Sequence, residues 1–364
     1  MFAVLFDKNF KALGTKTTYY CSSWSLTRRN FEMDSLTATT EKIDQSAKAV
    51  YIGMFNDVGR LSYLSFSGRP KNKKGLTTIT AMDLRRIFIQ NCMISYASYQ
   101  TSPTVKAWVT YLLGIPGSLC ASYGVIDYTI DTSEFDQQTV AWVDGSIPSA
   151  NAIGDLWEEL QAAMMRYNFT VVPECNITTD SSTGKTTGSI KFVVKMITKT
   201  YSIKLSDFDE ARVMNDSTEV NRAIAYNKTT GAEIGEWWLC SSPSTGKETI
   251  VPLASAAYLV KSGSLLTRVP ARYKTFSDED PDKAKSEALN ELEKNRYKGS
   301  VQISLDAPLA KELKNADIWC QAYIYGYNSA DDNTQKLLPM MWRSEDQSGQ
   351  VKACFGRLDD YYYI

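Results

Sequence analysis

Apolar and polar residues alternate along much of the N-terminal part of the chain, a pattern typical of strands joined by polar turns. The opening segment 1–6 is apolar and stops at a charged pair, so it predicts a first strand. Segments 47–55 and 61–68 flank a turn that contains Asn, Asp and Gly, and together they predict a β-hairpin.

Helical spacing interrupts this pattern in the middle of the chain. Ser102 and Pro103 form a helix start signal, an N-cap followed by a proline at the first helical position, and Gly114 predicts the end of that helix. A second helix is predicted over 152–166, where large apolar residues recur on one face. A shorter helical segment is predicted at 83–88.

The rest of the chain returns to strands and contains one clear amphipathic helix. That helix begins at Asp280-Pro281 and covers about 281–295, with alanine and leucine on its inner face. A strand over 219–226 and a return strand over 232–240 predict a second hairpin. Further strands are predicted at 169–172, 189–195, 301–305, 318–325, 337–343 and 351–355.

These elements predict a mainly β protein with a few helices, of the α+β class and with several domains. The length of 364 residues suggests two or three domains at about 150 residues each. We place a β domain at 1–97, an α+β middle domain at 98–204, and a second β domain at 205–364 with an inserted or flanking helix at about 281–295.

The charge balance and the missing histidine exclude several classes of function. With 40 basic and 41 acidic side chains, the net charge is −1. We therefore predict no specific nucleic-acid recognition, which usually needs a basic footprint. Without histidine, the chain can form neither a Ser-His-Asp nor a Cys-His catalytic pair, and no His-containing zinc site. Chemistry by carboxylates, Ser-Lys pairs or phosphoryl transfer remains open.

The seven cysteines point to a reducing compartment. None of them forms a C-x-x-C motif, so a zinc ribbon and a thioredoxin-type site are excluded. Several lie among apolar or aromatic residues, as in Trp319-Cys320, and we expect them to pack as small hydrophobic side chains in a reducing cytosol. No apolar run approaches the roughly 18 residues of a spanning helix, so no membrane-spanning segment is predicted.

Two stretches, 182–187 and 244–249, partly match the sequence of phosphate-binding loops. A P-loop needs a glycine at its first position so that backbone N–H groups can curl around the phosphates, but these positions hold Thr179 and Ser241. Both stretches are therefore interpreted as turns between strands.

Acidic residues cluster at three places, at 207–210, at 278–282 and at Asp359-Asp360. The second cluster precedes a helix, where negative charge favours the helix dipole, so a structural role explains it. Asp331-Asp332-Asn333 lacks the spacing of an EF-hand loop. We predict no catalytic residue, no cofactor and no metal site.

Aromatic residues make up 12% of the chain, including 21 tyrosines. The adjacent Trp237 and Trp238 and the terminal cluster Tyr361, Tyr362 and Tyr363 could stack on sugars or dock a partner subunit. Since the chain has few other site signatures, we interpret these five residues as candidate interface residues.

The sequence resembles siphophage tail-tip or baseplate hub proteins, the N-terminal structural part of the tail-associated lysin family. The similar passages are 7–10, 23–32, 79–88, 220–226 and 286–295, in this order along the chain. The passage 79–88 is similar to that family's "strand, Gly-x-Asp, Leu-Leu-x-Arg" segment, with Ala81 where glycine is common.

The resemblance implies two tube-like β domains, barrels or sandwiches, with smaller α/β insert domains. It also implies a homotrimer that offers six such domains to a hexameric tail tube. The sequence stops at Ile364 without a hydrolase segment, so we expect no wall-degrading activity.

We therefore predict a structural virion protein, a tail-tip hub that closes the distal tail tube and acts in host attachment and DNA passage. Its expected partners are the tail tube, distal tail proteins, receptor-binding or fibre proteins and the tape measure protein. It is expected at the tail tip of the virion, after assembly in the host cytoplasm. The alternatives are a peptidoglycan-degrading glycosidase with paired carboxylates and a saccharide-binding receptor-recognition module.

Overall fold

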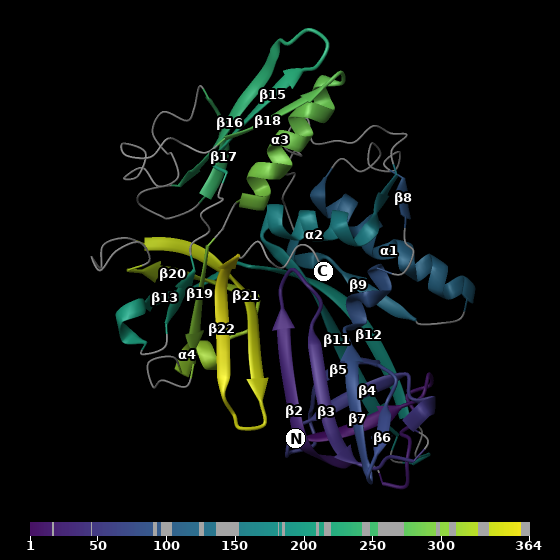
Figure 1. Cartoon of the computed structure of the whole chain (residues 1–364). Helices are drawn as coiled ribbons and strands as arrows, with labels where there is room; N and C mark the ends of the chain where they lie inside the picture. Colours follow the sequence, from purple (N-terminus) through teal and green to yellow (C-terminus); the bar gives the residue numbers. More distant parts are fainter. Residues whose placement is uncertain are drawn as a thin grey trace.

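The computed structural model confirms a mainly β chain with few helices, arranged in several sheets (Figure 1). A 13-stranded sheet and three smaller sheets account for the described strands. The structure describes residues 1–16, 18–44, 46–89, 93–95, 104–123, 127–135, 153–180, 182–183, 186–208, 211–214, 220–241, 248–253, 273–295, 299–305, 311–326 and 335–357.

The N-terminal strands form a closed six-stranded barrel. The strand order is β1-β4-β5-β7-β3-β2, and β1 also pairs with β2, which completes the circuit. The predicted hairpin is confirmed, because β4 and β5 pair antiparallel. The bounds are β1 Phe2–Phe6, β2 Tyr19–Arg29, β3 Ser35–Glu41, β4 Tyr51–Phe55, β5 Leu61–Ser67, β7 Leu76–Met82 and the short β6 Lys71–Lys73.

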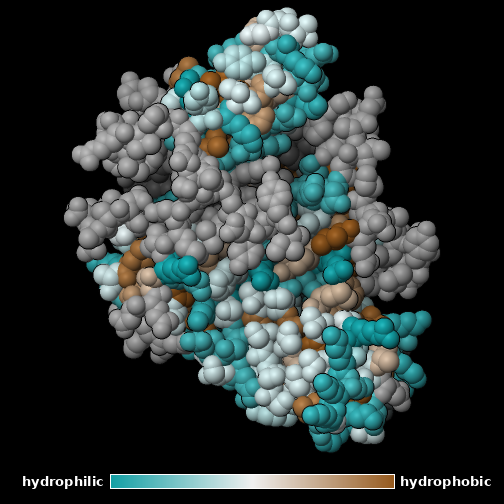
Figure 2. Space-filling model, in the orientation of Figure 1, coloured by the Kyte–Doolittle hydropathy of each residue, from teal (hydrophilic) through white to brown (hydrophobic). Residues whose placement is uncertain are grey.

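Alternation along each strand fills this barrel. On β3, Leu36 and Ala38 point inward and are buried, while Ser35, Thr37 and Thr39 point outward. Figure 2 shows the surface over β2 and β3 as mostly pale, as expected of serine and threonine. The interior is filled by buried hydrophobic side chains of every barrel strand, including Leu5, Cys21, Ile52, Tyr63 and Ile79.

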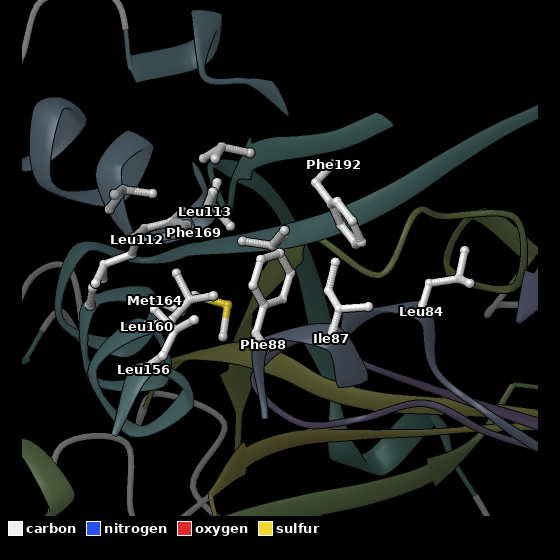
Figure 3. Close-up of a cluster of buried hydrophobic side chains, with 14 of the residues drawn as sticks. Leu84, Ile87, Phe88, Leu112, Leu113, Leu156, Leu160, Met164, Phe169 and Phe192 are labelled. Atoms are coloured by element: carbon white, nitrogen blue, oxygen red, sulfur yellow. The ribbon is translucent and has the colours of Figure 1, made fainter. Parts of the chain in front are cut away.

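Helices and a second sheet pack against the outside of the barrel. Figure 3 shows the side chains that meet there, with Phe88 between the helices and Phe192. Val4, Phe6 and Leu64 reach the same cluster from the outer face of the barrel, so both layers share one core. The elements are the 3-10 turns η2 Leu84–Phe88 and η4 Ser133–Phe135, the helices α1 Val105–Tyr123 and α2 Leu156–Tyr167, and the strands β8 Met93–Ser95, β9 Tyr128–Asp131, β10 Ile153–Asp155, β11 Phe169–Thr179 and β12 Thr186–Met196.

The bounds of the two middle helices differ from the prediction. The helix predicted to stop at Gly114 continues to Tyr123 and contains both Gly114 and Pro116. Ser102 and Pro103 lie outside the described residues, and Thr104 Oγ1 accepts from Ala107 N–H at 3.1 Å. The second helix starts later than predicted, since residues 153–155 form β10.

A second six-stranded unit follows, in the order β13-β20-β21-β22-β19-β14. Its core is mostly aliphatic and also contains an aromatic ring, with Ile303, Ile324 and Phe355 fully buried. Within the described residues, β13 and β14 are not paired with each other, so this unit is open where the first is closed. The bounds are β13 Lys199–Lys204, η5 Leu205–Asp207, β14 Arg212–Met214, β19 Gly299–Ser304, α4 Lys311–Lys314, β20 Cys320–Tyr325, β21 Gln335–Asp346 and β22 Val351–Arg357.

A four-stranded sheet with one helix is inserted between β14 and β19, at the top of Figure 1. The predicted hairpin and amphipathic helix are confirmed here, and Ala284, Ala288 and Leu292 of the helix are fully buried against the sheet. The bounds are β15 Arg222–Asn227, β16 Glu233–Ser241, β17 Glu248–Pro252, β18 Tyr273–Asp278 and α3 Pro281–Asn295.

The two six-stranded units are joined edge to edge by β2 and β21, which pair antiparallel. We call this contact the seam. Strands from both ends of the chain thus belong to one sheet, and β13, from the predicted middle segment, pairs with β20 of the last third. The division at 97/98 and 204/205 stays a prediction.

Candidate functional site

The structure separates the two adjacent tryptophans that the sequence singled out. Trp237 and Trp238 follow each other on β16, so their side chains point to opposite faces of the four-stranded sheet. Trp237 packs against the cluster beneath α3, and a Cβ atom on Gly235 would come within 2.7 Å of its ring. The two indole rings therefore do not form one stacking platform.

Trp238 belongs to a row of side chains across three neighbouring strands. Arg222 is paired in register with Trp238 and Tyr273, and its guanidinium lies 5.1 and 5.7 Å from the centres of the two rings. Glu236 accepts from Arg222 Nε and Nη2 at 2.6 and 2.9 Å, and from the indole Nε1 of Trp238 at 2.6 Å. Tyr273 is 61% exposed, so the row ends at an open aromatic ring.

Arg222 and Glu236 favour each other's charged form. The hydrogen bonds from Arg222 lower the pKa of Glu236, and Glu236 raises the pKa of Arg222. With three donors already bound, Glu236 stays ionised and is unsuited to general acid catalysis. In this row the Arg222–Glu236 pair orients the rings of Trp238 and Tyr273.

The other predicted interface cluster, Tyr361, Tyr362 and Tyr363, lies outside the described residues, as do Asp359 and Asp360. Of the acidic cluster before α3, Asp280 Oδ1 accepts from the N–H groups of Asp282 and Lys283 at 3.0 and 3.4 Å. Asp278 pairs with Lys283 at 2.9 Å. The predicted structural role of this cluster at a helix N-terminus is confirmed.

The stretch 182–187, which partly matches a phosphate-binding loop, lies at the tip of a hairpin. β11 and β12 pair antiparallel on either side of it, and Asp180 Oδ1 accepts from the N–H groups of Ser182 and Thr183 at 2.7 and 3.1 Å. This is a side-chain-stabilised turn, as predicted. In the other such stretch, 244–249, residues 244–247 lie outside the described ranges.

Sequence reasoning missed a buried ionic cluster that lies beside the seam. Arg85 is 2% exposed, and its guanidinium binds Asp83 Oδ2 through Nε at 2.8 Å and Nη2 at 2.6 Å. Nη2 also donates to Asp34 Oδ1 at 2.8 Å and to the carbonyl oxygen of Arg29 at 3.1 Å. One guanidinium therefore joins the end of β2, the start of β3 and the turn η2.

Burial and charge act in opposite directions in this cluster. Burial raises the pKa of Asp34 to about 6, although the charge of Arg85 acts to lower it. Burial acts to lower the pKa of Arg85, but Asp83 and Asp34 raise it above its ordinary value. Burial, followed by these two carboxylates, raises the pKa of Tyr63 well above its usual range. Arg85 is the fixed charge of the cluster, and Asp34 is the group that titrates.

Asn30 connects this cluster to the second unit. Its side-chain Nδ2 donates to the carbonyl oxygens of Ile318 and Met340 at 2.7 and 2.5 Å. Its own carbonyl oxygen accepts from Thr170 Oγ1 at 2.5 Å and from Arg85 Nη1 at 3.4 Å. Barrel, middle segment and second unit thus meet at one residue. The sequence signal was the charged pair Asp83 and Arg85 beside the apolar residues Leu84, Ile87 and Phe88.

The five cysteines whose side chains are described all carry free thiols: Cys21, Cys175, Cys240, Cys320 and Cys354. Burial raises their pKa, to about 11 for Cys21 and about 12 for Cys320. The prediction that cysteines serve as small hydrophobic side chains agrees with these five positions.

Neither a metal cluster nor a spanning helix is found in the described part of the chain. No group of three or more Cys, Asp or Glu side chains there is arranged to hold a metal ion. Among the described helices, none is long and apolar enough to cross a membrane.

No known protein family matches the sequence, and no curated protein matches it either. Solved structures do match the fold. The prophage tail protein gp18 from Listeria monocytogenes EGD-e aligns with a TM-score of 0.52 at 9% identity, covering 98% of this chain and 95% of that chain. A chain of the p2 virion baseplate in its activated conformation aligns with a TM-score of 0.51 at 10% identity, covering 98% of both chains. The chain therefore has the fold of phage tail and baseplate proteins, which confirms the predicted resemblance at the level of the fold.

Proposed function

We propose that this chain is a structural virion protein, a tail-tip hub that closes the distal tail tube and anchors distal or receptor-binding proteins. The observation that carries this proposal is the fold likeness to a prophage tail protein over nearly the whole of both chains. Because the likeness spans 98% of this chain, the inserted segments are included as well as the two β units. A likeness confined to one barrel would support no such role, since small β-barrels serve many functions.

The proposed assembly is a homotrimer. Each chain holds two six-stranded units joined at the seam, so three chains would present six units, matching a six-fold tube. The seam supports this role because a fixed angle between the two units is needed for all six to lie on one ring. The partners proposed are the tail tube, distal tail proteins, receptor-binding or fibre proteins and the tape measure protein.

The mass of the purified chain in solution, alone and with its tail-tube protein, tests the assembly. We expect a trimer, or a monomer that becomes a trimer in the presence of the tube protein. Electron micrographs of tails should then show a three-fold ring at one end that binds antibodies against this chain. Monomers under all conditions, with no labelling of tails, would contradict the proposal.

We propose no reaction for this protein. The glycosidase alternative requires two carboxylates that face each other across a cleft. Zymography with purified cell walls tests it. Sustained cleavage that a single Asp or Glu substitution abolishes would replace the structural role with an enzymatic one.

A further inference from the structure

Arg28 occupies an unusual place at the end of the barrel. It continues the row Trp24, Leu26, Arg28, whose first two members pack into the barrel interior, so its side chain starts on the inward face of β2. Across the seam it is paired in register with Arg343 of β21. Two like charges directly opposite each other on neighbouring strands are destabilising unless something compensates them.

The guanidinium of Arg28 lacks a full set of acceptors. Its Nε atom is buried and has no hydrogen-bond partner among the described residues. A buried charged donor left without an acceptor destabilises the folded state. Arg28 therefore differs from Arg85 beside it, whose guanidinium is bound on every side.

The nearby carboxylates are already engaged. Both oxygens of Asp83 accept hydrogen bonds, Oδ1 from Arg85 N–H at 2.8 Å and Oδ2 from Arg85 and from Asp34 N–H at 2.7 Å. Asp34 Oδ1 accepts from Arg29 N–H at 2.6 Å and from Arg85. The charge of Arg28 acts to lower the pKa of Asp34, but the two side chains form no ion pair within 4.0 Å among the described contacts.

Arg343 is only partly compensated. Its Nη1 donates to the carbonyl oxygen of Ala316 at 2.9 Å, and its Nη2 lies 3.7 Å from Glu345, a half-exposed side chain. Burial lowers the pKa of Arg343, and the charge of Arg28 lowers it further, while Glu345 raises it. A negative charge bound between the two arginines would therefore offset their mutual repulsion.

We propose that the seam holds an oxyanion site in which Arg28, with Arg343 opposite, binds a phosphate or carboxylate group. Arginine presents its N–H donors in a planar fork that matches the oxygens of both groups. Arg28 as a residue is partly exposed although its Nε atom is buried, so such a group would approach from the exposed part of the side chain. The source is either free phosphate or the carboxylate of a partner chain. The proposal does not depend on the tail-tip role, because anion binding can be measured on the isolated chain.

Thermal unfolding of the full chain tests the site, with sodium phosphate, sodium acetate or sodium chloride at equal pH and ionic strength. At ten times the dissociation constant, a bound anion should raise the Tm of this 364-residue chain by about 2 °C. A rise with phosphate alone indicates free phosphate as the source, and a rise with acetate indicates a carboxylate. No rise with either anion overturns the proposal.

Variants locate the effect. Arg28→Met should abolish the anion-dependent rise in Tm, while Arg86→Met, which removes an exposed arginine outside the seam, should keep it. Arg28→Lys keeps the positive charge but removes the planar guanidinium, so it should reduce the anion-dependent rise in Tm. This variant replaces Arg28→Met in the test if Arg28→Met does not fold. An equal rise in wild type and in Arg28→Lys and Arg28→Met would place the anion elsewhere and overturn the assignment.

Discussion

The side-chain amide of Asn30 donates a hydrogen bond to the carbonyl oxygen of Met340, 310 positions further along the chain. Asn30 is fully buried and follows directly after β2, and Met340 lies on β21. One side chain therefore fixes the two β units beside the strand pairing that joins them.

Replacing Asn30 by alanine should weaken the seam. The change removes two hydrogen bonds to backbone carbonyls in a buried place, and we expect a loss of about 1–3 kcal/mol in the free energy of unfolding. Chemical denaturation measures it. The control is Asn9→Ala on an exposed turn, which should change stability by less than about 0.5 kcal/mol. Equal effects of the two changes would show that Asn30 does not join the units.

Removing the central guanidinium should be more damaging. Arg85→Met leaves Asp83 and Asp34 buried without their cation, and we expect a loss of about 3–5 kcal/mol. Arg86 is the matched control, since it is the adjacent residue, of the same type, but exposed. Arg86→Met should be nearly neutral in the same denaturation experiment. A neutral Arg85→Met would mean that the cluster contributes nothing to stability.

Stability should fall as pH rises from about 4 to about 6. The pKa of Asp34 is about 6 in the folded chain, above the ordinary value of about 3.9, so the folded state holds a proton that the unfolded state releases. The free energy of unfolding, measured at several pH values, should show this slope in the wild type and lose it in Asp34→Asn.

Asp131→Asn is the control for that slope. Hydrogen bonds from Ser133 lower the pKa of Asp131, a partly exposed residue, to about 2, so its contribution to stability is lost only at a pH below about 4. The variant should therefore keep the slope between pH 4 and 6. An unchanged slope in Asp34→Asn would assign it to another group.

Two glycines should respond in opposite directions to alanine. A Cβ atom on Gly68 would collide with the backbone oxygen of Thr80 on β7, so Gly68→Ala should force strands apart and cost about 1–3 kcal/mol. Gly114 lies within α1 and has open space around its Cβ position, so Gly114→Ala should stabilise the chain by about 1 kcal/mol. Melting temperatures decide the sign of each.

Local patterns predicted much of the fold. The hairpin of β4 and β5, the strands β11 and β12 and the helix from Pro281 to Asn295 follow from alternation, turn residues and an N-terminal cap, all of which depend on neighbours in the sequence. The predicted end of α1 was wrong because residues beyond Gly114 still pack: Ile115 lies against the hydrophobic cluster and Pro116 is buried, against the local signal of the glycine.

The sequence by itself determined the β-rich class, the chemistry that the missing histidine excludes, and most strands and helices, because periodicity and composition are local properties. Only the tertiary structure decided that β1 closes on β2 and that β2 meets β21. It also decided that Arg85 is buried with two carboxylates while Arg28 lies opposite Arg343. These contacts join residues up to hundreds of positions apart, and their energies depend on burial, which no local pattern encodes.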